Sequence, residues 1–357
     1  MNWPIRFLIP LFLILAAAQI GRLQADERDD DVRGADLSRL VIVGDSISAG
    51  HQNSCLLNTQ QPNSYASLLA RQARVDLPLP LMGAPGLPPC LELASLDPLI
   101  IERSSVYPGF RIDPTVQAFN LSVPGMRIVD AQGTAFPSDF REQFFGFPFS
   151  LIHQQVLLGH PDGLSQIDIA ERLMPTTVVL WLGSNDVLWA LIGANPAFIT
   201  PESYFQYAFH QVLSRLVGTG ATVVVGNVPS INSIPFATPA EEVLVPLSES
   251  TGISVQILGH LLGIGPGDFV TLPGLPLIEE ILQTPGSDPL PPEVVLTAEE
   301  AAQIQAAVDA YNAFISSEVE SLRVDGFAVA LVDTDAMLKF VDENGLRLGH
   351  RKLTTDF

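Results

Sequence analysis

Three short polar motifs in this sequence hold the residue types of acyl-transfer chemistry. Ser46 ends the motif Gly44-Asp45-Ser46, Gly125 follows a proline in the motif 120–125, and Asn185 lies in the motif 183–186. A serine hydroxyl can attack an ester carbonyl, and backbone N–H groups or an asparagine amide can stabilise the oxyanion that forms. Glycine lets a backbone N–H come close to a ligand, since it has no side chain. For Gly44-Asp45-Ser46 alone, the alternative is a turn whose serine caps the next helix.

The elements that must position these motifs alternate between strands and helices. Five apolar runs with little polar alternation have the pattern of strands buried on both faces: 40–43, 116–121, 177–182, 221–225 and 327–332. Helices are predicted between or after them, at 64–74, 144–158, 201–216 and 297–324, the last with a capping box of Thr297 and Glu300. This order predicts a parallel sheet flanked by helices, with the three motifs at the edge where such sheets bind ligands.

Two Pro- and Gly-rich stretches, at about 77–114 and 236–292, interrupt this alternation. Apolar residues recur between their prolines, which favours ordered loop insertions over flexible linkers, and 255–264 has the pattern of a short apolar helix. Long ordered loops in compact domains often form lids or walls of a site, while the alternative is plain surface elaboration.

The charge balance narrows the choice of partners. The chain has 357 residues, with 39 acidic against 18 basic ones and a formal charge of -21, which repels phosphate backbones and anionic membranes. Nucleic acid is therefore not an expected partner. The cysteines and histidines show no metal-binding spacing, so neither a metal nor an organic cofactor is expected.

The N-terminus predicts export. Residues 1–25 have the layout of a signal peptide, with Arg6 before a short apolar stretch, and an acidic linker follows at 26–37. A retained anchor is the alternative, but the stretch is shorter than a bilayer requires and no later segment qualifies as a span. An exported protein would be secreted or periplasmic, where Cys55 and Cys90 could form a disulfide; two free buried cysteines are the alternative.

The three motifs, in this order, resemble the blocks of the GDSL-type SGNH hydrolases, a superfamily of lipases and esterases. Gly226-Asn227-Val228-Pro229 is similar to a turn found in many of these enzymes. The resemblance implies a flavodoxin-like SGNH fold over 38–357, a three-layer α/β/α sandwich with a central parallel five-stranded sheet. It also implies that Ser46 is the nucleophile, and that the Ser46 N–H, the Gly125 N–H and the Asn185 side chain form the oxyanion hole. An α/β-hydrolase elbow fits less well, because Ser48 replaces its second glycine.

The general base is the point where this sequence departs from the family pattern. The family supplies it from a final Asp-x-x-His block, and none of the six histidines here follows an aspartate at that spacing. The expectation is a chain that is C-terminally truncated and much less active, because a serine needs a base to become nucleophilic. His350 is the weak substitute by position, and His51 is a weak substrate-binding candidate.

The function expected from these residues is an exported serine hydrolase that cleaves carboxylic esters through a Ser46 acyl-enzyme. The apolar insertions favour a hydrophobic acyl group, so the expected partner is a small-molecule or lipid ester. Two alternatives stay open: a catalytically dead SGNH-fold protein that binds a ligand, and a carbohydrate O-deacetylase on the same fold.

Overall fold

A parallel four-stranded sheet forms the centre of the protein. Its strands lie in the order β1 (Leu40–Gly44), β4 (Thr177–Trp181), β5 (Thr222–Gly226) and β9 (Val329–Val332). The computed structural model describes residues 35–96, 99–134, 136, 139–158, 163–231, 236–284, 286–348 and 351–353. The predicted signal peptide 1–25 and most of the acidic linker therefore lie outside the described residues.

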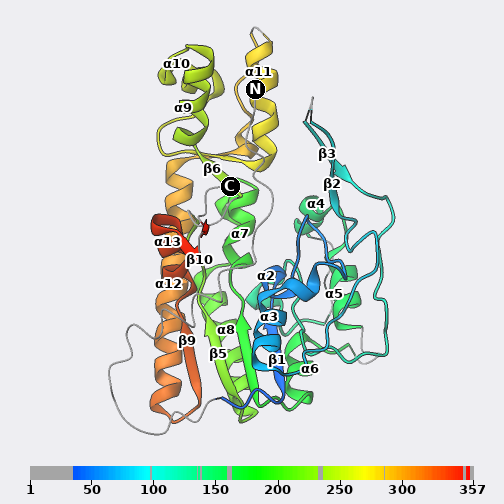
Figure 1. Ribbon diagram of the computed structural model, residues 1–357. Helices are drawn as coiled ribbons and strands as arrows, with labels where there is room; N and C mark the ends of the chain where they lie inside the picture. Colours follow the sequence, from blue (N-terminus) through cyan, green and yellow to red (C-terminus); the bar gives the residue numbers. More distant parts are fainter. Residues whose placement is uncertain are drawn as a thin grey trace.

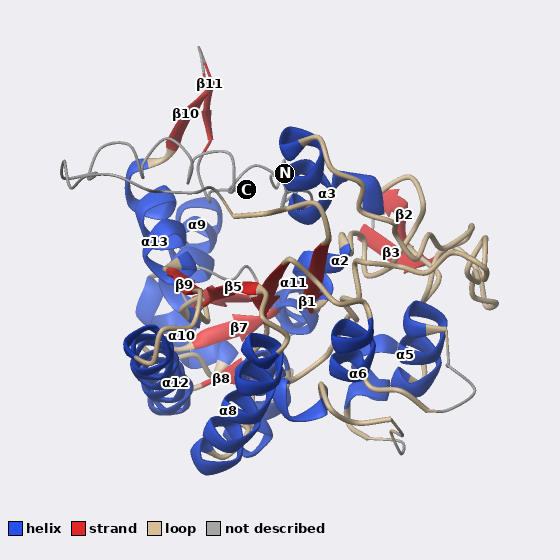
Figure 2. Cartoon of the chain, turned by 90° about the horizontal axis from the view of Figure 1, so that it is seen from below, coloured by secondary structure: helices blue, strands red, loops and turns tan. Residues whose placement is uncertain are grey.

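Helices cover both faces of this sheet because each strand points alternate side chains into different cores. Val41 and Val43 join the larger core, which is shared with α6 (Gln166–Arg172), α8 (Glu202–Gly218) and α12 (Ala298–Val324). Leu40 and Ile42 join a smaller core with α3 (Tyr65–Ala73). Figure 2 shows α3 on one side of the sheet and α6, α8 and α12 on the other. The mixed three-layer fold predicted from the sequence is confirmed.

The predicted count of five strands is wrong. The segment 116–121 makes one parallel bridge, between Asn120 and Ile42, with backbone bonds of 2.9 Å from Ile42 N to Phe119 O and from Leu121 N to Ile42 O. The residues before it leave the sheet edge, because the Val116 carbonyl accepts from the Arg111 guanidinium instead. Further along, Phe119 N donates to Pro78 O over 2.9 Å, so these backbone groups pair outside the sheet.

The predicted helices are largely confirmed. The segments 64–74, 201–216 and 297–324 correspond to α3, α8 and α12, and Thr297 and Glu300 form the expected capping box. The segment 144–158 is divided into α4 (Arg141–Phe145) and α5 (Phe149–Leu157), because Gly146 is left-handed and Pro148 precedes α5. None of the described helices is both long and apolar enough to cross a bilayer.

In the described residues both insertions carry regular elements, and α9 (Ala240–Thr251), α10 (Val255–Leu262) and α11 (Leu275–Gln283) of the second lie beyond the end of the sheet at which α2 (Ser46–Ala49) and α7 (Asn185–Ile192) begin (Figure 1). The first carries the hairpin of β2 (Leu91–Leu96) and β3 (Leu99–Arg103). The second has its own apolar core and contains α9, α10, α11, β6 (Ala237–Pro239) and β7 (Phe269–Thr271). β6 and β7 form an antiparallel sheet with β8 (Val295–Leu296), which follows the insertion. After β9 come α13 (Thr334–Asn344) and the hairpin of β10 (Leu346–Leu348) and β11 (Arg351–Leu353).

Candidate active site

Ser46 is the first residue of α2, directly beyond the end of β1. Asp45 caps this helix, since its Oδ1 accepts a hydrogen bond of 3.0 Å from Ile47 N. The alternative in which the serine caps the helix is therefore wrong. The turn is crowded, because a Cβ on Gly44 would lie 2.4 Å from Ser48 Oγ. Among the described residues no group forms a hydrogen bond with the Ser46 hydroxyl, which leaves it available to a substrate.

Asn185, the first residue of α7, lies beside this turn although it follows β4 and not β1. Its Nδ2 donates to Asp45 Oδ2 and to Met126 O, each over 3.1 Å. The end of β1, the loop that carries Gly125 and the end of β4 thus meet at one place, as the order of the motifs predicted. The two amide hydrogens of Asn185 are used by these partners, so donation to an oxyanion requires that one of them be exchanged.

Gly125 has the backbone conformation that favours glycine. Its φ is 80°, and a Cβ there would lie 2.7 Å from the Phe145 ring and 3.3 Å from Trp189. Within the part of the chain that the structure describes, the Gly125 and Ser46 N–H groups have no acceptor. Two unpaired backbone N–H groups beside a serine can stabilise an oxyanion. The roles of Ser46, Gly125 and Asn185 stay predictions.

Of the two histidine candidates the structure describes His51, whose ring does not lie at the Ser46 hydroxyl. His51 N donates to Ser46 O over 3.1 Å, but the ring lies by Ser54 and Arg103. Burial, assisted by the Arg103 charge, lowers the pKa of His51 to about 4, so the ring is neutral near pH 7. His350 lies outside the described residues. The described residues contain no cluster of His, Cys, Asp or Glu that could hold a metal ion.

Gln166 is a residue of this site that the sequence reasoning missed. It is fully buried at the start of α6, and its Nε2 donates over 2.9 Å to both Gly44 O and Leu121 O. It therefore ties the end of β1 to the loop that leads to Gly125. Its only sequence signal is the capping box of Ser165 and Asp168 around it, which indicates a helix start but not this contact.

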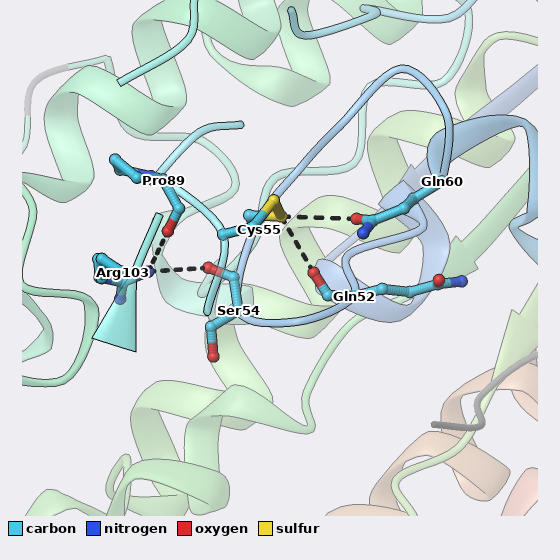
Figure 3. The surroundings of a disulfide bond; sticks show 7 residues. Gln52, Ser54, Cys55, Gln60, Pro89 and Arg103 are labelled. Carbon is cyan, nitrogen blue, oxygen red and sulfur yellow. Dashed lines mark hydrogen bonds between the residues drawn. A yellow bond between two sulfur atoms is a disulfide. The ribbon is translucent and has the colours of Figure 1, made fainter. Parts of the chain in front are cut away.

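Cys55 and Cys90 form a disulfide, which joins the segment after α2 to the first insertion. The alternative of two free buried cysteines is therefore wrong. The Arg103 guanidinium donates to Pro89 O over 2.6 Å and to Ser54 O over 3.4 Å, so it joins the two segments that the disulfide links (Figure 3). The same side chain donates to Phe145 O over 2.6 Å. Arg103 therefore connects the disulfide-linked segments to the last residue of α4.

Loss of this disulfide should lower the stability of the folded protein. The bond closes a loop with a sequence separation of 35 residues, for which chain entropy predicts about 3–4 kcal/mol of stabilisation. We expect the double variant Cys55→Ser/Cys90→Ser to unfold at a correspondingly lower urea concentration. A reductant should lower the midpoint of the natural protein and leave that of the variant unchanged; equal midpoints for both proteins without reductant would contradict the prediction.

Two buried carboxyls lie at this edge of the sheet. Burial raises the pKa of Asp45 to about 7, against the hydrogen bonds from Ile47 and Asn185. Burial likewise raises the pKa of Asp186 to about 7, although Asp186 Oδ2 accepts from Ile128 N over 2.8 Å. Between about pH 4 and pH 7 these carboxyls are protonated in the folded protein and ionised in the unfolded chain. Their contribution to the free energy of unfolding is therefore complete below about pH 4 and is lost as the pH rises through 7.

A comparison with Asp45→Asn isolates this effect. Burial lowers the pKa of His51 and His153 to about 4, so these rings change stability in the opposite sense between about pH 4 and 6.5. We expect the unfolding free energy of the natural protein, relative to that of Asp45→Asn, to fall by about 3 kcal/mol from pH 4.5 to 7.5. Urea titrations at each pH measure it. The exposed control Asp113→Asn should keep the pH dependence of the natural protein. If the unfolding free energies of Asp45→Asn and the natural protein changed in parallel with pH, the buried Asp45 carboxyl would not be the cause of that dependence.

The comparisons with known proteins agree with this geometry. The family model described as GDSL-like Lipase/Acylhydrolase matches residues 40–352, which include the sheet, both insertions and all three motifs. No curated protein matches the sequence.

Proposed function

The chain belongs to the GDSL-like lipase/acylhydrolase family, and on that basis we propose that it is an exported serine hydrolase that cleaves hydrophobic acyl esters. The observation that carries the proposal is the convergence of Ser46, Gly125 and Asn185 from three separate segments. In the proposed reaction Ser46 Oγ attacks the ester carbonyl, the alcohol leaves, and water then releases the acid from the acyl-enzyme. The N–H groups of Ser46 and Gly125 would hold the oxyanion, with Asn185 as the third donor.

Export is supported by the N-terminal sequence pattern and by the Cys55–Cys90 disulfide, since disulfides persist in oxidising compartments. A secreted or periplasmic location follows from the same proposal. Expression of the full-length gene in its own host, followed by fractionation, tests it. Retention of the protein in the cytosol with both cysteines reduced would contradict export.

The preference for a hydrophobic acyl group is supported by exposed apolar side chains on the two insertions and by a cavity beside the Gly125 loop. Leu93, Ile100 and Ile101 on the first insertion stay at least 40% exposed, and Ile257 on the second is 61% exposed. A cavity of about 570 Å³ opens beside the loop of Gly125, where Arg127, Phe140 and Phe198 belong to its lining. These side chains could contact a chain of methylene groups, each of which contributes about 0.8 kcal/mol when buried.

A fluorophosphonate probe tests the proposal, because it forms a covalent bond only with an activated serine. We expect stoichiometric labelling of the natural protein and none of Ser46→Ala, with peptide mapping to Ser46. Hydrolysis of p-nitrophenyl acetate, octanoate and palmitate then tests the acyl preference, which equal turnover of all three would contradict.

A second candidate is a protein that keeps the fold and binds a ligand without catalysis. Two observations favour it: the described residues place no histidine at the Ser46 hydroxyl, and the Asn185 amide is occupied by Asp45 and Met126. Absence of labelling, together with saturable binding of a non-hydrolysable alkyl phosphonate ester, would establish this function instead.

A further inference from the structure

Arg141, at the start of α4, is a buried cation that the proposed reaction does not use. It is 1% exposed and its guanidinium lies 3.7 Å from the centre of the Phe149 ring. Its Nε donates to both oxygens of Asp139, over 3.0 and 2.9 Å, and its Nη1 donates to Asp130 Oδ2 over 2.7 Å. Burying a charge is costly even when it is paired, and an apolar side chain could fill the same space. A packing role alone therefore does not explain an arginine here.

The same guanidinium reaches the loop of Gly125. Arg141 Nη1 donates to Gly125 O over 3.3 Å, and Asn185 Nδ2 donates to the next carbonyl, Met126 O. Two consecutive carbonyls of this loop are thus held by two separate elements, one by α4 and one by α7. Arg127 binds Asp130 over 2.9 and 3.0 Å, so the carboxylate that holds Arg141 is itself held in place.

This contact bears on the direction of the Gly125 N–H. A glycine at φ 80° has no Cβ to restrict its backbone, and one local bond, from Met126 N to Val123 O over 3.1 Å, holds the peptide that carries the Gly125 carbonyl. The bond from Arg141 is a second, non-local restraint on the same peptide. The Gly125 N–H belongs to the preceding peptide, so Arg141 acts on it through the Gly125 Cα. With the carbonyl side of the residue fixed, fewer orientations are open to the N–H side. An arginine suits this task, since its rigid fork can bind two carboxylates and a carbonyl at once.

We propose that Arg141 is a positioning residue of the oxyanion hole, which directs the Gly125 N–H at the substrate carbonyl by holding the Gly125 carbonyl. The inference rests on the proposed hydrolase function, because it requires an oxyanion to form at this place. It predicts that Arg141 acts on the transition state and leaves substrate binding in the ground state unchanged.

The test compares Arg141→Gln and Arg141→Lys with the natural protein. We expect Arg141→Gln to lower kcat for p-nitrophenyl octanoate and the rate of fluorophosphonate labelling by 10- to 100-fold, with KM within about twofold. Arg141→Lys keeps the charge and one donor, so we expect partial recovery of both rates. If Arg141→Gln does not fold, as judged by circular dichroism, Arg141→Lys alone carries the test, with an expected loss of three- to tenfold.

Arg215→Gln is the matched control. Arg215 also binds two carboxylates, Asp168 over 2.7 Å and Glu171 over 2.5 Å. In the described structure its hydrogen bonds go to these two residues and to Gln132, and not to the Gly125 loop. We expect this variant to lose stability while kcat stays unchanged. Folded Arg141 variants with the natural kcat, or a loss of kcat equal to that of Arg215→Gln, would overturn the positioning role and leave the proposed function intact. An unreactive Ser46 in the natural protein would overturn the proposed function first, and this inference with it.

Discussion

Replacing Asn185 by alanine should slow the acylation of Ser46 by roughly 10²- to 10³-fold, the usual effect of losing one oxyanion donor. The reason is geometric: Asn185 Nδ2 lies between Asp45 Oδ2 and Met126 O, next to both the nucleophile turn and the Gly125 loop. When a substrate carbonyl becomes an oxyanion, it competes for these amide hydrogens as a stronger acceptor. The second-order rate of fluorophosphonate labelling and kcat/KM for an ester measure the effect.

Asn227→Ala provides the control for this prediction. Asn227 is also a buried asparagine that follows a strand of the sheet, and its Nδ2 donates to Asp333 Oδ1 over 2.8 Å while its Oδ1 accepts from Thr334 and Asp335. We expect this variant to lose stability without loss of the labelling rate. A similar drop in rate for both variants would mean that Asn185 acts through folding alone.

Replacing Gly125 by alanine should lower both stability and reactivity. The new Cβ would lie 2.7 Å from the Phe145 ring, and the φ of 80° disfavours any side chain. Overpacking and backbone strain together cost about 2–4 kcal/mol, and relief of the clash would move the Gly125 N–H away from the oxyanion. Urea unfolding measures the first effect, and the labelling rate of the folded fraction measures the second.

Gly218→Ala is the matched substitution for Gly125→Ala. Gly218 is the last residue of α8, and a Cβ there would meet no atom within 4 Å. Since alanine favours a helix over glycine by up to about 1 kcal/mol, we expect unchanged or slightly higher stability and an unchanged labelling rate. If Gly125→Ala also kept its stability and labelling rate, neither the contact with Phe145 nor the left-handed backbone would limit the residue at position 125.

Predictions from the sequence succeeded where the signal is local. The run 40–43 has only buried side chains in β1, and Thr297 and Glu300 cap α12 as their spacing indicated. They failed where a distant group competes for the backbone. The run 116–121 reads as a strand, but the Arg111 guanidinium takes the Val116 carbonyl and one bridge to Ile42 remains.

Most elements and the family could be predicted from the sequence, because apolar runs, caps and short motifs depend on residues that are neighbours in the chain. The sequence also determined that Ser46, Gly125 and Asn185 should share one edge, since parallel strands end on the same side of a sheet. The pairing of Cys55 with Cys90 and the contact of Arg141 with the Gly125 carbonyl became visible in the folded structure alone. These contacts join residues that are distant in the chain, and their meeting depends on how loops close and helices pack, which no local pattern encodes.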